Sequence, residues 1–315
     1  MSVVVTMGMW LGSFTCGLPG FDLDIFCQKM SQYKANWAHI VPPVAVLLAQ
    51  SDIPVKYDLS ALKRIIVAAA PMKKPLQMRL KCRFGKSTKV LQGYGLTECA
   101  PTVMHQHESD EADYVGTVGK VVAGTEVRLV DPITRDDVAP GSGKEGELWV
   151  RGPQVMIGYL GDASATRETL SPDGQWLRTG DIMRMDKNNN FWITDRLKEL
   201  IKYKGFQVAP SELEDLLLHH PHVVDAAVCS IYDDEQATEL PLAYVSLKPD
   251  LVRLAQGPKQ NVLDEIRTWV DGQVAGYKKL RGGVFHLQEL PKTPTGKILR
   301  KDLPAKIAQA RKAKL

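Results

Sequence analysis

Two short apolar runs, each ending at a turn, constrain the fold of this chain most. The first run lies at residues 62–70 and contains the letters IIVAAA, and the second is Val90-Leu91. The second run leads directly into a glycine-bearing turn at 93–95. Nearly continuous apolar runs of this length are typical of strands buried in a parallel sheet. The sequence therefore predicts an α/β fold for the first half of the chain, with a helix at 72–84.

Length and composition restrict the class of protein further. A chain of 315 residues is long enough for two domains. Apolar residues make up 44% and charged residues 24%, which is ordinary globular usage and excludes disordered, collagen-like and disulfide-scaffold classes. The net charge of +4 is too small to indicate a nucleic-acid-binding surface. We expect a soluble globular protein that does not bind nucleic acid.

The second half of the chain has a different pattern. Valine, glycine and threonine dominate residues 115–160, and turn dipeptides there separate short β-type runs. Strands are expected at 126–130, 146–151, 191–194, 199–202, 224–231 and 241–247, and a helix at about 261–275.

A second helix is expected after Pro210, where Ser211 and Glu214 have the spacing of a capping box. Strands and helices in this order predict a mixed α+β small domain behind the α/β part. We place the boundary near Asp195, which gives domains at 1–197 and 198–315.

The cysteines and histidines do not indicate a metal site. The cysteine count is odd and no pair has metal-knuckle or redox spacing, so we expect reduced thiols in an intracellular compartment. Cys99 has no evident basic partner that would activate it as a nucleophile. His219, His220 and His222 have a spacing that suits no common metal site, so we expect a structural role.

Each end of the chain resembles a targeting signal. Residues 1–21 are almost uncharged and about as long as a membrane span, but glycines interrupt them and no basic n-region precedes them. We expect a core helix and loop there, and no membrane span. The last residues, Ala313-Lys314-Leu315, fit the pattern of the Ser-Lys-Leu peroxisomal signal. They predict a peroxisomal protein that binds the import receptor; the alternative is a basic helix tail.

The turn at 92–98 carries residues that suit a nucleotide. Glycines at 93 and 95 allow a ligand to approach the backbone closely. Thr97 offers a hydroxyl to a phosphate, and Glu98 offers a hard oxygen to Mg²⁺. Taken alone, the same residues also fit an ordinary tight turn.

Three further stretches carry candidate ligand-binding groups. Asp181 follows a glycine in the turn at 176–181, which suits a carboxylate that accepts hydrogen bonds from a ribose. The stretch 195–214 has four basic residues near Gly205, and it fits either a phosphate-binding surface or a solvated charged hairpin. Lys297 lies on a loop shaped by glycine and proline, where a mobile positive charge could reach an active site.

Together and in this order, the four stretches resemble the adenylate-forming (AMP-binding) superfamily. The likeness is strongest to 4-coumarate–CoA ligases, firefly luciferase and related acyl-CoA ligases, and it includes Gly146-Glu147-Leu148, Gly152 and Gly158-Tyr159. The resemblance implies an ATP-dependent acid–thiol ligase. A carboxylic acid attacks the α-phosphate of ATP, with Mg²⁺, to give acyl-AMP and pyrophosphate, and the thiol of CoA then displaces AMP. Both steps depend mainly on positioning and charge stabilisation.

The resemblance also implies roles for residues of the large domain. The residues expected to bind AMP or ATP are Ala69, Gln92, Gly93, Tyr94, Thr97 and Asp181. Thr97 contacts the α-phosphate and Glu98 binds the metal. The acyl pocket is expected to contain Ala69, Gly93, Pro101, Thr102 and His105. Family members often have glycine where this chain has Ala68, and related ligases often have an apolar residue in place of His105.

A further set of roles falls on the basic residues after the boundary. Arg196 is expected beside Asp181, and Lys198 is expected at the hinge and near the nucleotide. The resemblance implies that Lys202 serves thioester formation and Lys297 serves adenylation, while Lys204 and Gly205 contact CoA.

One family motif is missing from the 315 residues. Family enzymes carry a Ser/Thr/Gly-rich loop that ends in lysine and holds the β- and γ-phosphates. The nearest match here, Gly85-Lys86-Ser87, lacks the upstream glycine and follows no clear strand. We therefore expect the chain to be N-terminally truncated and to begin inside the large domain of the family.

Three functional hypotheses remain open at this point. The first is an acyl- or aryl-CoA ligase, impaired or not by truncation. The second is a non-catalytic remnant or half-enzyme that binds AMP, CoA or a complementing chain. The third is an amino-acid-adenylating domain of a peptide synthetase, which the CoA-ligase-like turn at 204–207 and the lack of a following carrier domain disfavour.

Overall fold

The chain divides into two compact units, Met1–Ile193 and Thr194–Leu315, here called the large unit and the small unit. The computed structural model describes residues 8–70, 72, 74–110, 114–249, 251, 260–293 and 297–306. The division lies inside strand β9 (Phe191–Arg196), a few residues before the boundary expected at 197/198. The tripeptide Ala313-Lys314-Leu315 lies outside the described residues, so the peroxisomal signal stays a prediction.

The large unit begins with a five-stranded sheet in the order β1-β2-β3-β4-β5. Strands β1 (Trp37–Ile40), β2 (Arg64–Val67) and β3 (Lys89–Gly95) are parallel; the two apolar runs predicted β2 and β3, but β1 was not predicted. Strands β4 (Thr102–His105) and β5 (Lys120–Val121) continue the sheet antiparallel.

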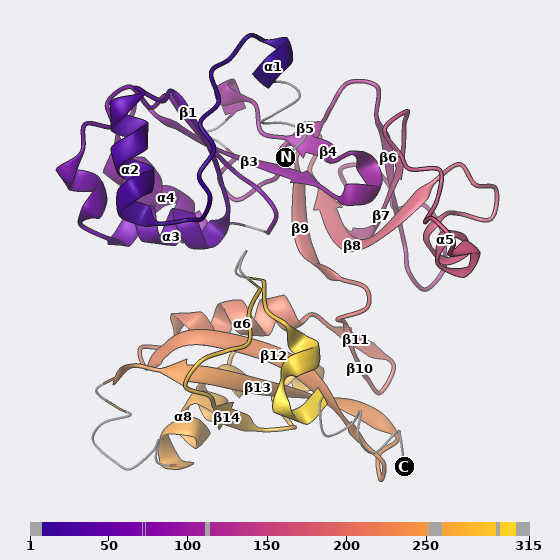
Figure 1. Cartoon of the computed structure of the whole chain (residues 1–315). Helices are drawn as coiled ribbons and strands as arrows, with labels where there is room; N and C mark the ends of the chain where they lie inside the picture. Colours follow the sequence, from indigo (N-terminus) through magenta and orange to yellow (C-terminus); the bar gives the residue numbers. More distant parts are fainter. Residues whose placement is uncertain are drawn as a thin grey trace. The chain divides into compact units, whose positions relative to one another are not determined.

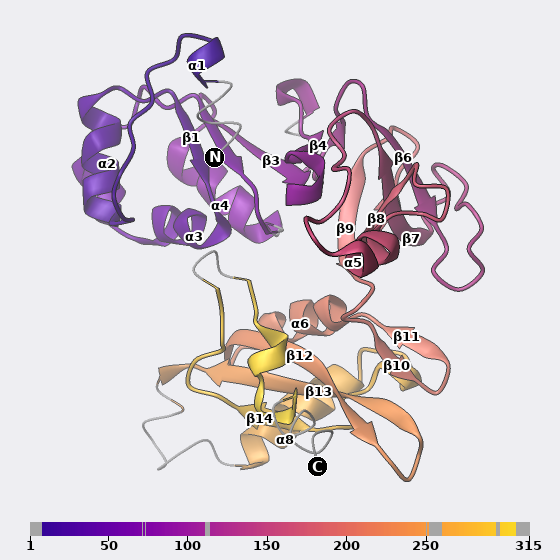
Figure 2. The same ribbon diagram turned by 45° about the vertical axis from the view of Figure 1, so that its right-hand side comes forward.

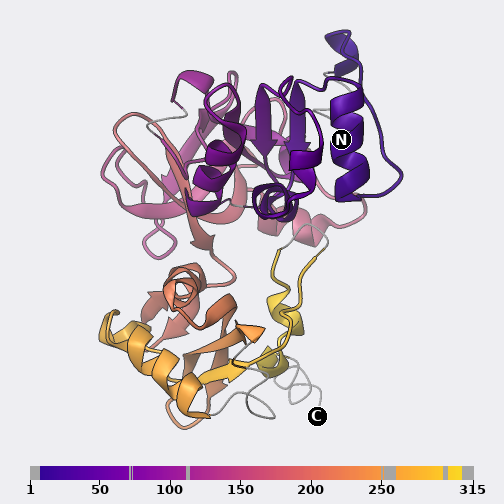
Figure 3. The same ribbon diagram turned by 90° about the vertical axis from the view of Figure 1, so that its left-hand side faces the viewer.

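Helices pack against the parallel strands of this sheet (Figures 1 and 3). They are α2 (Leu23–Gln32), α3 (Pro42–Gln50) and α4 (Lys74–Phe84), and a short 3-10 helix, η2 (Ile53–Lys56), lies beside α2. The carboxylate of Asp22 accepts a hydrogen bond from the N–H of Ile25 and so caps α2. Helix α4 matches the helix expected at 72–84. The fully buried side chains Leu48, Ile65 and Leu80 belong to one core between helices and sheet.

The expectation of a core helix near the N-terminus is wrong for the described residues. Residues Gly8–Trp10 form one helical turn, α1, and a loop follows it. The side chains of Met9, Trp10, Leu11 and Phe14 are 61–85% exposed, although the ring of Phe14 lies 5.2 Å from that of Tyr33. Among the described residues, no helix combines the length and the apolar character needed to cross a bilayer.

The large unit continues with a four-stranded sheet in the order β6-β7-β8-β9. Its remaining elements are β6 (Glu126–Val130), β7 (Glu145–Arg151), β8 (Leu177–Met185) and the short helix α5 (Ala163–Thr169). The strands predicted at 126–130 and 146–151 are confirmed. The turn predicted at 176–181 is instead largely part of β8, because an irregularity in its pairing with β7 accommodates the glycine.

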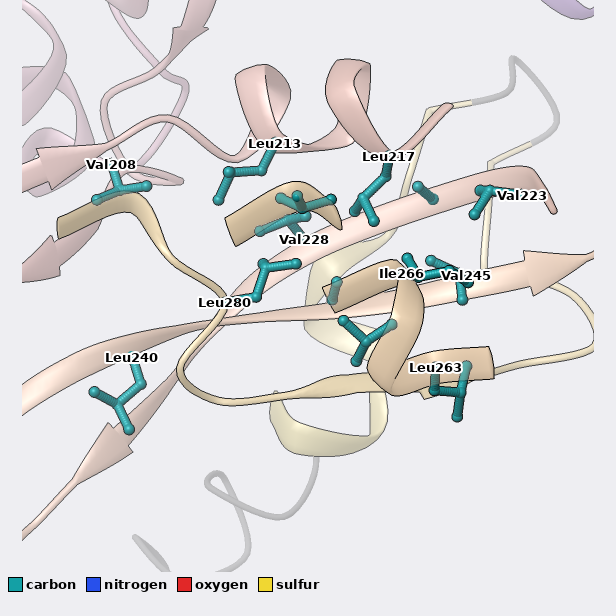
Figure 4. Packing of buried hydrophobic residues seen from close by; sticks show 14 of the residues in the cluster. Val208, Leu213, Leu217, Val223, Val228, Leu240, Val245, Leu263, Ile266 and Leu280 are labelled. Carbon is teal, nitrogen blue, oxygen red and sulfur yellow. The ribbon is translucent and has the colours of Figure 1, made fainter. Parts of the chain in front are cut away.

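The small unit is a three-stranded sheet, β12-β13-β14, with helices and a hairpin packed on it. The bounds are β10 (Ile201–Tyr203), β11 (Phe206–Val208), α6 (Pro210–His219), β12 (Val223–Asp233), β13 (Thr238–Leu247), α8 (Gln260–Asp271), η5 (Gly276–Lys278), β14 (Val284–His286) and η6 (Arg300–Asp302). Figure 4 shows Leu213 and Leu217 of α6 pointing toward Val228 of β12, and Ile266 of α8 beside Val245 of β13.

The capping box expected at the start of α6 is wrong. The helix begins at Pro210, and its N-cap residue Ala209 makes no side-chain capping bond. The hydroxyl of Ser211 donates instead to Asp195, and a carboxylate oxygen of Glu214 accepts the N–H of Val228. Pro210 occupies the first position of the helix, where proline is favoured. The side chains of Ser211 and Glu214 are therefore not used for capping and bind neighbouring segments.

The small unit has a core of its own, so the fragment 194–315 is expected to fold alone. It should show a single cooperative unfolding transition in urea, followed by circular dichroism. Because Ile266 is fully buried in this core, Ile266→Ala should lower the free energy of unfolding of the fragment by about 2–5 kcal/mol. A gradual, non-cooperative transition in the unmutated fragment would show that the core needs the large unit.

Candidate active site

The glycine turn after β3 is shaped by close backbone contact. The N–H of Leu96 donates to the carbonyl oxygen of Pro101 at 2.8 Å. A Cβ at Gly95 would lie 1.8 Å from that same carbonyl oxygen, so only glycine fits there. The 3-10 helix η3 (Thr97–Cys99) follows, with Thr97 exposed and Glu98 half-buried. The turn thus presents both polar side chains while its backbone is fixed.

Three buried glutamines hold the start of this turn. Gln77, Gln92 and Gln106 are at most 2% exposed. The side-chain oxygen of Gln92 accepts the N–H of Met72 at 2.9 Å. The main-chain N–H of Gln92 donates to the side-chain oxygen of Gln106 at 2.8 Å. The side-chain amide of Gln77 donates to the carbonyl oxygen of Val90 at 2.8 Å. The side chain of Gln92 therefore braces the turn against the segment after β2.

Gln77 and Gln106 escaped the sequence-based reasoning because they lie outside every motif. One signal was available, since Gln77 lies on the same helical face as Leu80, a position where an apolar residue is usual. A buried glutamine on such a face indicates a hydrogen-bond partner across the sheet.

Gln77→Leu should destabilise the chain because it removes both halves of a buried amide. The N–H of Gly116 and the carbonyl oxygen of Val90 lose their partners, and an unsatisfied buried group costs about 1–3 kcal/mol. Urea unfolding of the large unit would measure the loss. The matched change at an exposed glutamine, Gln50→Leu, should stay within about 0.5 kcal/mol of the unmutated protein. Equal effects of the two substitutions would contradict a bracing role for Gln77.

Tyr94 and Asp181 bring two distant motifs together. The hydroxyl of Tyr94 donates to Oδ2 of Asp181 at 2.6 Å, across 87 residues of sequence. Both side chains are buried. Burial and the adjacent Asp181 carboxylate hold the pKa of Tyr94 well above its ordinary value, so the phenol stays protonated and remains a donor. This hydrogen bond orients the carboxylate that the sequence assigned to ribose.

Asp181 projects from an irregular stretch of β8. The pairing register shifts between Glu147/Ile182 and Trp149/Arg178, which leaves Thr179, Gly180 and Asp181 opposite Leu148 alone. Gly180 has a φ of +69°, which glycine adopts without strain.

Side chains close this bulge on both sides. The hydroxyl of Thr179 donates to the carbonyl oxygen of Leu148 at 2.8 Å, and a carboxylate oxygen of Glu147 accepts the N–H of Gly180 at 3.2 Å. The N–H of Asp181 donates to the hydroxyl oxygen of Thr179 at 3.1 Å. These hydrogen bonds between side chains and the main chain hold the bulge in shape and so set the position of Asp181.

Glu98, the expected metal ligand, is held by contacts with the loop that precedes α5. The hydroxyl of Tyr159 donates to Oε1 of Glu98 at 2.7 Å, and this bond raises the pKa of Tyr159. The N–H of Met156 donates to the carbonyl oxygen of Glu98 at 2.8 Å. Tyr159 belongs to the Gly158-Tyr159 pair that contributed to the resemblance. In the structure this pair contacts the glycine-turn motif through the hydrogen bond from Tyr159 to Glu98.

The donor set around Glu98 suits Mg²⁺ better than a metal caged by protein. Among the described residues there is no cluster of three or more His, Cys, Asp or Glu side chains that could hold a metal ion. Mg²⁺ is usually bound through one or two carboxylates together with substrate phosphates. One oriented carboxylate beside the Thr97 hydroxyl fits that mode. Burial raises the pKa of the Cys99 thiol to about 12, so Cys99 is not a nucleophile.

The residues expected at the acyl pocket lie on both sides of the glycine turn. Gly93 pairs with His105 across β3 and β4, and a Cβ at Gly93 would lie 3.9 Å from the His105 ring. Burial lowers the pKa of His105, which favours a neutral imidazole near neutral pH. Pro101 and Thr102 are half-buried just before it. Ala69 is exposed after β2 and has a left-handed φ of +75°, a conformation that favours glycine.

In the small unit, Lys202, Lys204 and Gly205 share one hairpin. Strands β10 and β11 pair Tyr203 with Phe206 around a two-residue turn, and φ is +46° at Lys204 and +85° at Gly205. Positive φ at both positions is the geometry of a type I′ turn. Lys202 and Lys204 are both exposed. The hairpin therefore presents two cations from one short, defined loop.

The hairpin is tied to the strand pair behind it. The N–H of Lys202 donates to Glu239 at 2.7 Å, and the N–H of Lys204 donates to the hydroxyl oxygen of Thr238 at 2.7 Å. The hydroxyl of Thr238 donates in turn to the carbonyl oxygen of Lys202 at 3.0 Å. These contacts fix the backbone that carries the two lysines.

The segment with Arg196 and Lys198 is anchored by Asp195. One carboxylate oxygen of Asp195 accepts the N–H of Arg196 at 2.6 Å, and the other accepts both the N–H and the hydroxyl of Ser211. Burial raises the pKa of Asp195, although these hydrogen bonds oppose the shift. The sequence had indicated either a phosphate-binding surface or a solvated charged hairpin here, and it did not reveal the anchoring by Asp195. Arg196 belongs to the small unit and Asp181 to the large unit, so the expected proximity of the two stays a prediction.

Lys297 lies on one arm of a narrow hairpin. Lys292 and Ile298 form an antiparallel bridge, and the N–H of Thr293 donates to the carbonyl oxygen of Lys297 at 2.8 Å. The N–H of Lys297 donates to the hydroxyl oxygen of Thr293 at 3.1 Å. The residues 294–296 between the two arms lie outside the described residues.

Both units of the chain match models of known protein families. The model of the AMP-binding enzyme family matches residues 1–160, and the model of the AMP-binding enzyme C-terminal domain matches residues 212–297. The chain belongs to the AMP-binding enzyme family. Its two matched regions correspond to the large and the small unit.

Curated relatives are 4-coumarate–CoA ligases from plants. The chain is 39% identical to 4-coumarate:CoA ligase 1 of Petunia hybrida over 311 residues, which cover 98% of this chain and 55% of that enzyme. It is 42% identical to 4-coumarate–CoA ligase 1 of Glycine max over 294 residues, which cover 92% of this chain and 96% of that sequence. The chain thus spans about half the length of the petunia enzyme.

Solved structures of the same fold contain adenylate ligands. ATP-bound MatB from Rhodopseudomonas palustris matches 96% of this chain with a TM-score of 0.82 at 26% identity, and 56% of that chain is covered. An anthranilate CoA ligase in complex with anthranoyl-AMP matches 98% with a TM-score of 0.78 at 28% identity, and 59% of it is covered. These likenesses confirm the mixed α/β fold expected for an adenylate-forming enzyme.

Proposed function

We propose that this chain carries the adenylate-binding and thioester-forming residues of an acyl- or aryl-CoA ligase. The reaction joins a carboxylic acid to the α-phosphorus of ATP with loss of pyrophosphate. The thiol of CoA then attacks the acyl carbonyl, and AMP leaves. The observation that carries the proposal is the hydrogen bond between Tyr94 and Asp181, because it unites the glycine turn and the ribose carboxylate in one site.

The large unit supplies groups that position the nucleotide. Asp181, oriented by Tyr94, accepts hydrogen bonds from ribose hydroxyls. The Thr97 hydroxyl donates to the α-phosphate, and the Glu98 carboxylate, oriented by Tyr159, would hold Mg²⁺. The metal, when bound, neutralises charge on the phosphates. Fixed groups of this kind stabilise developing charge without reorganising during the reaction.

The small unit supplies cations for two different steps. Lys297 and Lys202 lie on separate hairpins, at 291–299 and 201–208. A lysine on one hairpin stabilises the pentacoordinate α-phosphate during adenylation. A lysine on the other stabilises charge as the CoA thiol attacks, with Lys204 and Gly205 contacting CoA.

A second candidate function is binding of AMP, CoA or a complementing chain without turnover. It is favoured by the exposed apolar side chains of Met9, Trp10 and Phe14, which a second chain could cover. Acid-dependent exchange of labelled pyrophosphate into ATP distinguishes the two functions, with medium-chain fatty acids and cinnamate-like acids as the panel. Binding of AMP with no exchange for any acid would support the second function.

The two lysines should fail in different half-reactions. Lys297→Ala should lower acyl-AMP formation by about 10²–10³-fold, the usual effect of removing one charge-stabilising group, and spare CoA capture of supplied acyl-AMP. Lys202→Ala should do the reverse. The matched change at an exposed lysine of the same unit, Lys248→Ala, should alter neither step. Equal losses of both half-reactions in each lysine variant would contradict the division of roles.

A further inference from the structure

Arg300 lies at the base of the Lys297 hairpin and contacts three other segments. Its Nε donates to the carbonyl oxygen of Val228 on β12 at 3.0 Å. One terminal nitrogen pairs with Glu214 of α6 at 2.7 Å, and the other pairs with Glu199. Figures 1 and 2 both show η6, which begins at Arg300, against β12.

This cluster is largely shielded from solvent, and each of the three nitrogens of the guanidinium has a partner. The side chains of Arg300, Glu199 and Glu214 are 17%, 23% and 8% exposed. The oxygen of Glu214 that binds Arg300 also accepts the N–H of Val228 at 2.9 Å. Removing one partner from such a cluster leaves buried charge uncompensated. Burial alone would lower the pKa of Arg300, but the neighbouring carboxylates raise it, so the guanidinium stays charged.

The contacts connect two functional segments. Arg300 follows Lys297 on the same arm of the hairpin, and the N–H of Leu299 donates to the carbonyl oxygen of Pro291 at 2.8 Å. Glu199 directly follows Lys198 in the segment expected to act as the hinge. One guanidinium thus joins the Lys297 hairpin to the hinge segment, to α6 and to β12.

We propose that Arg300 is a positioning residue that fixes the Lys297 hairpin to the hinge segment, so that Lys297 is presented for adenylation as part of one rigid body. The inference rests on the proposed function for the role of Lys297. Arg300→Lys should not preserve the anchor, because a lysine ammonium donates from one nitrogen on a flexible stem, whereas the rigid planar guanidinium reaches its three partners from three separate nitrogens. The role of Arg300 therefore depends on the geometry of its side chain as well as on its charge.

Hydrogen exchange of the full chain tests the anchoring without any activity. In Arg300→Met and in Arg300→Lys, the N–H groups of Thr293 and Leu299 should exchange at least tenfold faster, while those of Ala243 and Val245 inside the sheet stay protected. The control Lys278→Met breaks an ion pair with Glu212, which lies on α6 as Glu214 does, and it should leave the hairpin unchanged. Unchanged exchange at Thr293 and Leu299 in both Arg300 variants would overturn the proposal. Full protection in Arg300→Lys alone would overturn the geometric argument.

Half-reaction kinetics test the consequence for Lys297. A small misplacement of a reacting group costs about 10²-fold in rate, so Arg300→Met should lower kcat for acyl-AMP formation by 10–100-fold with KM for ATP unchanged. CoA capture of supplied acyl-AMP should be retained. Equal losses in the two half-reactions would instead indicate general unfolding and contradict a positioning role.

The two measurements separate the possible failures. If the unmutated chain shows no pyrophosphate exchange, the proposed function fails, while hydrogen exchange still decides whether Arg300 anchors the hairpin. If Arg300→Met does not fold, Glu199→Gln keeps the other two contacts of the guanidinium. That variant should raise exchange at Leu299 by a smaller factor, and no rise would overturn the link to the hinge segment.

Discussion

The buried hydrogen bond between Tyr94 and Asp181 is the interaction on which the large unit depends most. Tyr94 lies near the end of β3 in the five-stranded sheet, whereas Asp181 lies on β8 of the four-stranded sheet. The ring of Tyr94 also belongs to the core that includes Leu148 and Leu177. A carboxylate buried this deeply is costly without a donor. The same contact therefore joins two sheets, neutralises part of that cost and orients a site residue.

Buried polar side chains position the segments that carry the exposed polar groups of the site. Gln92 braces the turn that presents Thr97, Asp195 braces the segment of Lys198, and Glu214 binds the arginine beside the Lys297 hairpin. Asp195 and Glu214 have no expected ligand of their own, whereas Gln92 is also among the residues expected to bind the nucleotide. Such supporting groups hold a site more accurately than loops alone can.

The sequence predicted strands β2, β3, β12 and β13 well, because apolar runs report burial directly. It failed where a polar side chain has more than one possible partner. Ser211 and Glu214 have capping-box spacing, yet Pro210 begins the helix and both side chains bind other segments. The segment at 176–181 reads as a turn because a bulged strand and a turn both require glycine. Contacts such as Gln77 with Val90 depend on the packed fold, and no local pattern reveals them.

The two-residue turn at Lys204-Gly205 has a consequence for which changes this site tolerates. Lys202 is exposed between Ile201 and Tyr203, which are both buried. Since side chains alternate along a strand, one added or lost residue in the turn would shift the pairing and bring Lys202 toward the core. Surface loops usually vary freely in length. Here the length of the loop is fixed even where its side chains can change, so substitutions should be far better tolerated than insertions.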